Sequence, residues 1–349
     1  MSDNIKQLRI SNDAKDDPQE LQRRIADEGY LFFRRLVNPD KMLELRREMM
    51  SVIQQVGWLI AGTDPMRGIA DINMRYTEGD NEYTAGYAEV YKNENFHRSA
   101  HWPEFQDIVA AMTGAPVMPH PQKVARIWFP KYTEHTTPTH QDFVHFQGSY
   151  DNITCWAPIG DCPIELGGLA VIPESHKVER VLEHHFALGA GGLIVDETEH
   201  EEIDPVWHSI DYEPGDALFF PALTIHRALP NYTDDRLRLS LDNRYMIVGD
   251  KIAEHMLEPH GPSGLTWEDI YPHWQQDDLK YYWRDFDNTV VARDLSYGEK
   301  GFAEALELAR AGDQDAIFML QRAVKNGKNR VDLNEAVSVL EELGLAAER

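Results

Sequence analysis

The sequence has 349 residues, of which 42% are hydrophobic and 10% aromatic, a balance typical of a folded protein rather than a disordered one. With 34 basic and 59 acidic residues the formal charge is -25. This charge argues against binding to nucleic acid or to an anionic membrane, because both need a basic surface. Only two cysteines are present, which argues against a secreted disulfide framework, and we expect Cys155 and Cys162 to be reduced core thiols.

The first residues, Met1 to Gln7, lack the basic and then apolar layout of a signal peptide. No apolar run approaches the length of a membrane span. We therefore expect a soluble, cytoplasmic protein that binds a small molecule and neither nucleic acid nor a membrane.

Residues 1–18 are polar and are predicted to form a flexible N-terminal segment. Asp17-Pro18-Gln19-Glu20 places proline and acid where a helix begins. A short strand is predicted over Gly29–Phe33, and a second helix from Asn38 to about Gln55. Residues 60–120 indicate loops and short helices around a sheet.

The pattern changes after Lys123, where Val124, Arg126 and Trp128 alternate with apolar neighbours and so predict a strand. Further strands are predicted near residues 140–146, 152–158, 168–172, 206–212, 216–220, 224–228 and 236–246. Eight short strands separated by turn signals indicate a mainly β domain over residues 19–250, with flanking helices. A sandwich or closed barrel of the jelly-roll type is the fold that such spacing favours.

Two regions lie outside this regular spacing. Residues 174–205 form a long, acidic insertion, and an insertion of this length is more often a functional lid than a passive loop. Residues 251–349 are predicted to form an aromatic-rich and then helical C-terminal extension. Two roles for its helices are equally favoured: a homo-oligomer interface, or a structural cap on the β domain.

The motif with the clearest chemistry is His140-Gln141-Asp142. On a strand, side chains two apart point to the same side, so this imidazole and this carboxylate are expected together. His226, at the end of a distant predicted strand, can add a second imidazole, although a histidine there is as often a satisfied core residue. Two histidines and one carboxylate bind Fe(II) and leave positions open for a cosubstrate and O2. The chain's other His-x-acid triplet, His200-Glu201-Glu202, lies in a charged run and is interpreted as a solvated loop.

The strand that follows His226 carries a second signal. Leu237, Leu239 and Leu241 share one face, and the other face holds Arg236, Arg238, Ser240 and Asp242. Inward arginines are costly unless an anion meets them. A dicarboxylate fits, because one end can chelate iron while the far carboxylate takes a bidentate arginine. We assign this role to Arg238 with Ser240, and keep Arg236 as the rival.

Three segments in order carry a family resemblance: His140-Gln141-Asp142, Gly167–His176, and Gly215-Asp216 with His226 and Asn231. Over roughly residues 20–246 the chain resembles the phytanoyl-CoA dioxygenase family. This family is a branch of the Fe(II)- and 2-oxoglutarate-dependent oxygenases with a double-stranded β-helix (jelly-roll, cupin-like) core. The family's Pro-Gly-Ser-His turn appears here as Pro173-Glu174-Ser175-His176, a departure that leaves the metal site untouched.

The resemblance implies that His140, Asp142 and His226 hold the iron, that Arg238 holds 2-oxoglutarate, and that Trp156 lines the cosubstrate pocket. O2 would take the remaining position, and oxidative decarboxylation would give succinate and CO2. Relatives that halogenate lack the carboxylate of the triad, so Asp142 favours hydroxylation or a related oxidation. The expected function is thus a dioxygenase that oxidises a small-molecule metabolite.

Two other functions stay open. A cupin-like metal enzyme that does not use 2-oxoglutarate would keep the metal face without needing the arginines. A non-catalytic metal-binding barrel is the third reading, against which the triad argues because structural zinc usually takes four protein ligands. The substrate is also open, and no basic stripe for the phosphates of coenzyme A is visible.

Several other side chains are secondary candidates. His145 and Arg126 are possible substrate contacts, and His176 is expected to stabilise a turn. His184 and His185 lie in the insertion, and the sequence indicates no partner for either.

Overall fold

The computed structural model describes residues 5–74, 76–78, 80–261, 264–327 and 333–345, and its centre is a pair of facing β-sheets. The smaller sheet has the order β1 (Lys6–Gln7), β10 (His208–Ser209), β7 (Leu169–Val171), β12 (Ile225–Ala228) and β5 (His140–Gln141). The larger has the order β2 (Leu31–Phe33), β11 (Ala217–Pro221), β6 (Ile153–Pro158), β13 (Arg238–Ile247) and β3 (Val117–Pro119), with β4 (Val124–Trp128) also paired to β13. The predicted jelly roll is confirmed.

Alternation along the strands of the larger sheet separates two cores. Ala217 and Phe219 of β11 pack against helices, whereas Leu218 and Phe220 lie between the sheets. Burying a side chain the size of phenylalanine contributes about 2 kcal/mol, so each face is strongly fixed. A shift of one residue in register would exchange the two faces.

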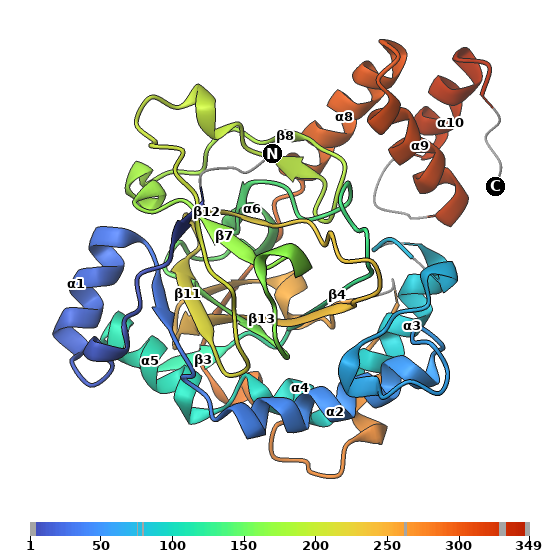
Figure 1. The fold of residues 1–349 in the computed structure, drawn as a ribbon. Helices are drawn as coiled ribbons and strands as arrows, with labels where there is room; N and C mark the ends of the chain where they lie inside the picture. The colour runs from blue at the N-terminus through green and yellow to red at the C-terminus, as the bar shows by residue number, and fades with distance from the viewer. Residues whose placement is uncertain (1–4, 75, 79, 262–263, 328–332, 346–349) are drawn as a thin grey trace.

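Five helices cover the outer face of the larger sheet: α1 (Pro18–Glu28), α2 (Pro39–Gln55), α3 (Asn81–Tyr91), α4 (Glu94–Ser99) and α5 (Pro103–Thr113). Figure 1 shows them as a continuous layer along one side of the sheets. The first two helices begin where the sequence predicted. The side chains of Asp17 and Asn38 accept hydrogen bonds from backbone N–H groups of the first turns, and a proline follows each cap.

The N-terminal segment differs from its prediction. Residues 5–17 are not a frayed end, because β1 pairs in parallel with β10 and Leu8 is buried between the sheets. Ala14 also packs into the helix-covered core. The polar composition of this segment gave no indication that Leu8 and Ala14 would be buried. Residues 1–4 lie outside the described chain.

The strand predicted over residues 140–146 is wrong in its second half. β5 ends at Gln141, Asp142 has helical angles (φ -59°, ψ -28°), and Phe143–Phe146 form the short helix α6. The apolar run is compatible with a buried helical turn as well as with a strand, which is the usual ambiguity of short apolar runs. Likewise β13 begins at Arg238, so Arg236 lies before the strand.

The insertion at 174–205 covers the outer face of the smaller sheet. Leu182, Val195 and Ile203 pack there with Ile172 and Ile225. Its regular elements are η5 (Ser175–Val178), the hairpin β8 (His185–Phe186) with β9 (Leu193–Ile194), and η6 (Glu197–Glu199). The insertion therefore covers this sheet, and the turn of its hairpin lies against His145, which follows β5.

The C-terminal region has two parts. Residues 250–295 contain β14 (Lys251–Ala253) paired with β15 (Thr289–Val291) and the short helices η7 (Glu254–Leu257), α7 (Trp267–Ile270), η8 (Tyr271–His273) and η9 (Tyr282–Asp285). The helices α8 (Ser296–Arg310), α9 (Gln314–Asn326) and α10 (Leu333–Glu342) follow and share a separate apolar core. In Figure 1 they stand at one corner of the molecule, beside β8 and above α3. Within the described ranges, no helix combines the length and apolarity that a membrane span requires.

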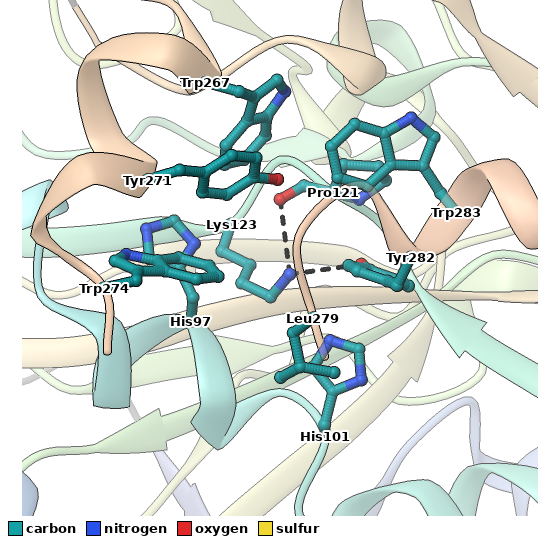
Figure 2. Close-up of a pocket in the computed structure, with 10 residues that line it drawn as sticks. All are labelled: His97, His101, Pro121, Lys123, Trp267, Tyr271, Trp274, Leu279, Tyr282 and Trp283. Atoms are coloured by element: carbon teal, nitrogen blue, oxygen red, sulfur yellow. Dashed lines mark hydrogen bonds between the residues drawn. The ribbon is translucent and has the colours of Figure 1, made fainter. Parts of the chain in front are cut away.

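The aromatic part of the C-terminal region packs around a buried lysine. Lys123 is 1% exposed, and its Nζ donates to the carbonyls of His120 and Pro121 and to the hydroxyl of Tyr282. Figure 2 shows this ammonium group enclosed by a ring of side chains: His97, His101, Trp267, Tyr271, Trp274, Leu279, Tyr282 and Trp283. The enclosed space has no room for a water molecule. Burial lowers the pKa of Lys123 from 10.5 to about 7.

This lysine should make stability depend on pH above neutrality. Between pH 7 and 10.5 the unfolded chain holds a proton that the folded chain releases, so the free energy of unfolding rises with pH in that window. Above pH 10.5 the total rise in the free energy of unfolding from this lysine reaches about 5 kcal/mol. The pKa values of His97 and His101, lowered by burial to about 3 and about 2, keep both rings neutral throughout. Chemical denaturation at pH 7 and pH 9.5 should show a smaller rise for Lys123→Met than for the unmodified protein, and equal rises would contradict the assignment.

Candidate active site

The two histidines of the predicted triad meet through strand pairing. His226 of β12 is in register with His140 of β5, and their ring centroids lie 4.1 Å apart. Asp142 Oδ1 lies 3.4 Å from His140 Nε2 and 3.5 Å from His226 Nε2. All three residues are at least 96% buried. In the described part of the chain this is the one group of three or more His, Cys, Asp or Glu side chains close enough to hold a metal ion.

Backbone carbonyls orient both imidazoles. His140 Nδ1 lies 2.7 Å from the carbonyl of Pro138, and His226 Nδ1 lies 3.0 Å from that of Thr224. We assign the ring proton to Nδ1 in each, which leaves the Nε2 lone pairs directed at Asp142. Burial, and then the neighbouring His226, lower the pKa of His140, so this ring is neutral. Two imidazoles that turn their Nε2 atoms toward one carboxylate fit a divalent metal ion.

The second oxygen of Asp142 is held by two residues that the sequence analysis did not single out. The hydroxyl of Thr154 donates to Oδ2, and Arg244 Nη2 lies 3.2 Å from both carboxylate oxygens. Although burial opposes it, Arg244 holds the pKa of Asp142 well below its usual range. The carboxylate is therefore charged, with Oδ1 turned to the histidines. Extending the alternation of β13 by two residues beyond Asp242 would have identified Arg244.

A second buried polar cluster lies between the sheets around Arg238. This side chain is 1% exposed, and its guanidinium carbon lies 4.4 Å from the ring centroid of Trp128 and 5.2 Å from that of Trp156. Among the described residues, Arg238 Nε and Nη1 and Ser240 Oγ have no hydrogen-bond partner. Buried donors without acceptors are costly, so this cluster fits a carboxylate. Trp128, whose Nε1 is also without a partner there, was not among the predicted site residues.

The structure separates the two rival arginines. Arg236 is half-buried and pairs through its backbone with Ile69, outside the strand that carries Arg238. Its carbonyl accepts a hydrogen bond from Asn231 Nδ2 at 2.8 Å, which fixes the turn that precedes β13. Only Arg238 of the two lies between Trp128 and Trp156.

Of the secondary candidates, His145 lies nearest to the triad. It lies on α6 rather than on a strand, 5.2 Å from His140 between ring centroids, and its pKa is well below the usual value because it is buried and faces His140. Arg126 already binds a carboxylate, since Nη1 lies 2.7 Å from an oxygen of Glu78. His145 therefore lies against a member of the triad, whereas Arg126 lies in an ion pair with Glu78.

The other three histidines named as candidates have structural partners. His184 Nε2 accepts the N–H of Gln141 at 3.3 Å, and His176 Nε2 lies 3.0 Å from the carbonyl of Ala26. His185 Nδ1 lies 3.0 Å from Glu304 of α8. Cys155 and Cys162 are buried and unpaired, as expected.

Two histidines and one carboxylate converging inside a jelly roll form the donor set of a mononuclear non-haem iron oxygenase. Residues 25–239 match the model of the phytanoyl-CoA dioxygenase (PhyH) family, and the chain belongs to this family. It is an enzyme of the non-haem iron, 2-oxoglutarate-dependent class. The C-terminal helices lie outside the matched range.

The chain is similar to several characterised proteins. It is 23% identical over 255 residues to the 1-deoxypentalenic acid 11-beta-hydroxylase of Streptomyces arenae, covering 70% of this chain and 86% of that protein. It is 32% identical over 117 residues to the methylphosphonate hydroxylase of Gimesia maris, covering 33% and 42%. The crystal structure of SnoK, a non-heme alpha ketoglutarate dependent carbocyclase from nogalamycin biosynthesis, superimposes with a TM-score of 0.49 at 19% identity, covering 68% of this chain and 87% of that one.

Proposed function

We propose that this chain hydroxylates a small-molecule metabolite with Fe(II), 2-oxoglutarate and O2, releasing succinate and CO2. The observation that supports this most is the presence of two buried polar sites in the same jelly roll. His140, Asp142 and His226 converge on one point, and Arg238 with Ser240 offers buried donors that lack an acceptor among the described residues. The names of the two hydroxylases above support a small-molecule substrate.

Each residue of the two sites has a distinct task. His140, His226 and Asp142 Oδ1 would hold the iron, and Thr154 and Arg244 would keep Asp142 in the orientation that presents one oxygen. Arg238 and Ser240 would bind the far carboxylate of 2-oxoglutarate, with Trp128 and Trp156 as the walls. Bound iron supplies the activation of O2, coupled to oxidative decarboxylation of the cosubstrate. Burial of both sites excludes water from the reacting groups.

The alternative functions explain less of this geometry. A cupin-like enzyme that does not use 2-oxoglutarate would leave Arg238 and Ser240 buried without an acceptor, which costs free energy. A purely structural metal site would usually have four protein ligands, and three are present here.

Succinate release tests the proposal. Anaerobically purified protein is supplied with Fe(II), 2-oxoglutarate and air, and a panel of small acids and polar metabolites is added one at a time. We expect succinate to form only when iron, 2-oxoglutarate and O2 are all present, and to form faster with the true substrate. Oxidation of a panel member without 2-oxoglutarate would instead favour the cupin-like alternative.

Two further expectations belong to this proposal. Reduced, buried cysteines support a cytoplasmic location, which cell fractionation checks. A homo-oligomer formed through α8–α10 stays a prediction, and light scattering of the full chain measures it.

A further inference from the structure

A row of alternating charges runs from the metal-binding carboxylate to the edge of the barrel. Arg244 Nη2 lies 3.2 Å from Asp142, and Arg244 Nη1 lies 2.8 Å from Asp242 Oδ1. Asp242 Oδ2 lies 3.8 Å from Arg126 Nε, and Arg126 Nη1 lies 2.7 Å from Glu78. Side-chain exposure rises along this row from 2% at Asp142 to 23% at Glu78. The outer end, at Glu78, is therefore the most exposed part of the row.

Glu78 lies between η3 (Ile72–Met74) and α3, and a C-terminal helix holds it there. Arg322 of α9 donates from Nε to Asp80 Oδ1 at 2.9 Å and from Nη2 to the carbonyls of Thr77 and Glu78. Asp80 in turn accepts the N–H of Thr77 at 2.8 Å, and the N–H of Glu78 donates to the hydroxyl of Tyr132 at 3.2 Å. One guanidinium thus fixes the backbone from which the Glu78 carboxylate reaches Arg126.

The C-terminal helices α8–α10, here called the C-terminal unit, also hold the β8–β9 hairpin. Glu304 of α8 accepts the N–H of Phe186 at 2.7 Å and lies 3.0 Å from His185 Nδ1. Gly301 packs so closely on the β8–β9 hairpin that a Cβ there would lie 2.7 Å from Leu193 Cδ2. At the hairpin turn, a Cβ on Gly191 would lie 3.0 Å from the ring of His145, which contacts His140. The unit α8–α10 therefore joins the hairpin on one side to Glu78 on the other.

We propose that the C-terminal unit completes the substrate site, and that Arg322 is a positioning residue that sets Glu78 opposite Arg126. This inference rests on the proposed function and deepens it by giving a substrate class. An apolar molecule placed against Glu78, Arg126 and Asp242 would strip water from these charges without replacing its hydrogen bonds. The substrate is a small, polar metabolite with charged or hydrogen-bonding groups that bind this row.

Hydrogen exchange tests the positioning without any substrate. In Arg322→Gln, the amides of Thr77 and Glu78 should exchange at least about tenfold faster. The reason is that Arg322 no longer holds Asp80, which accepts the N–H of Thr77, or the carbonyls of Thr77 and Glu78. Peptides from α8–α10 should keep their protection. Arg310→Gln is the matched control, since Arg310 lies in the same unit, is 49% exposed and pairs with Glu342. Unchanged exchange at Thr77 and Glu78, or faster exchange throughout α8–α10, would overturn the positioning role.

Kinetics test the role in the substrate site. The probes are amino acids, amino sugars and hydroxy acids as the polar set, with fatty acids as the apolar set, and succinate release is measured for each. With a polar substrate, Glu78→Gln and Arg322→Gln should each raise KM about tenfold. The KM of the double variant should not exceed that of Glu78→Gln. The Kd of 2-oxoglutarate should stay unchanged in all three. Additive effects, or turnover of a fatty acid alone, would overturn this inference. Absence of succinate from the unmodified protein would instead overturn the proposed function, and the exchange experiment would still decide the role of Arg322.

Discussion

Asp142→Ala will bind Fe(II) at least about 100-fold more weakly than the unmodified protein, and its succinate release will fall below about 1% of the original rate. Removing a partner that merely orients a metal ligand typically costs 10–100-fold in affinity, so loss of the single carboxylate ligand should reach or exceed the top of that range. Anaerobic titration calorimetry with Fe(II) measures the affinity directly.

The same substitution removes the counter-charge of Arg244, whose guanidinium lies 3.2 Å from the carboxylate. An uncompensated buried charge costs about 3–5 kcal/mol, so the variant must be checked for folding by circular dichroism before its affinity is interpreted. His226→Ala gives a second measurement of the Fe(II) affinity, because it removes a ligand and leaves the ion pair between Asp142 and Arg244 intact.

Glu202→Ala is the matched control, because Glu202 is the carboxylate of the chain's other His-x-acid triplet and pairs with Arg180 on the surface. It should bind iron as the unmodified protein does. If Asp142→Ala, once shown to be folded, bound Fe(II) normally, the triad would not be the metal site.

Arg238→Ala will raise the Kd of 2-oxoglutarate about 100-fold and leave the iron affinity unchanged. A hydrogen bond to a charged group contributes about 1.5–3 kcal/mol, and the guanidinium offers two buried donors. At saturating 2-oxoglutarate most of the turnover should return, since the iron ligands are unaltered. Arg238→Lys should recover only part of the affinity, because an ammonium cannot bind a carboxylate with a planar fork.

Arg236→Ala is the control for this experiment, because it removes an arginine two residues away that lies outside the pocket. Calorimetric titration with 2-oxoglutarate in the presence of Mn(II), under anaerobic conditions, compares the two variants. A large loss of affinity in Arg236→Ala, with none in Arg238→Ala, would exchange their roles.

The parts of the site that lie on one strand could be predicted from the sequence. On β13 the leucines face the helices while Arg238 and Ser240 face the interior, because side chains alternate along a strand. The contact between His140 and His226 could be predicted by assuming that their two distant strands lie side by side. The resemblance to a family supplied the order of the segments, and the match over residues 25–239 confirmed it.

Features that depend on register between distant strands could not be predicted. Thr154 reaches Asp142 because β6 and β13 pair with Thr154 opposite Arg244, and no local pattern sets that register. The strand beginning at His140 was predicted too long, because Asp142 turns into a helix that the apolar residues after it equally allow.

The C-terminal region was the least predictable part of the chain. Its aromatic residues gave no indication that they surround Lys123, since a lysine between apolar residues usually marks an exposed position. Likewise, Arg322 on an amphipathic helix is ordinarily a solvated side chain, and only the tertiary structure brings it to Thr77, Glu78 and Asp80.

The most direct test of the account is a crystal grown anaerobically with Fe(II) and 2-oxoglutarate, with diffraction data collected at the iron absorption edge. We predict one anomalous peak within bonding distance of His140 Nε2, Asp142 Oδ1 and His226 Nε2, and a 2-oxoglutarate whose far carboxylate binds Arg238 and Ser240. An iron peak elsewhere, or a cosubstrate carboxylate bound away from Arg238, would contradict the account.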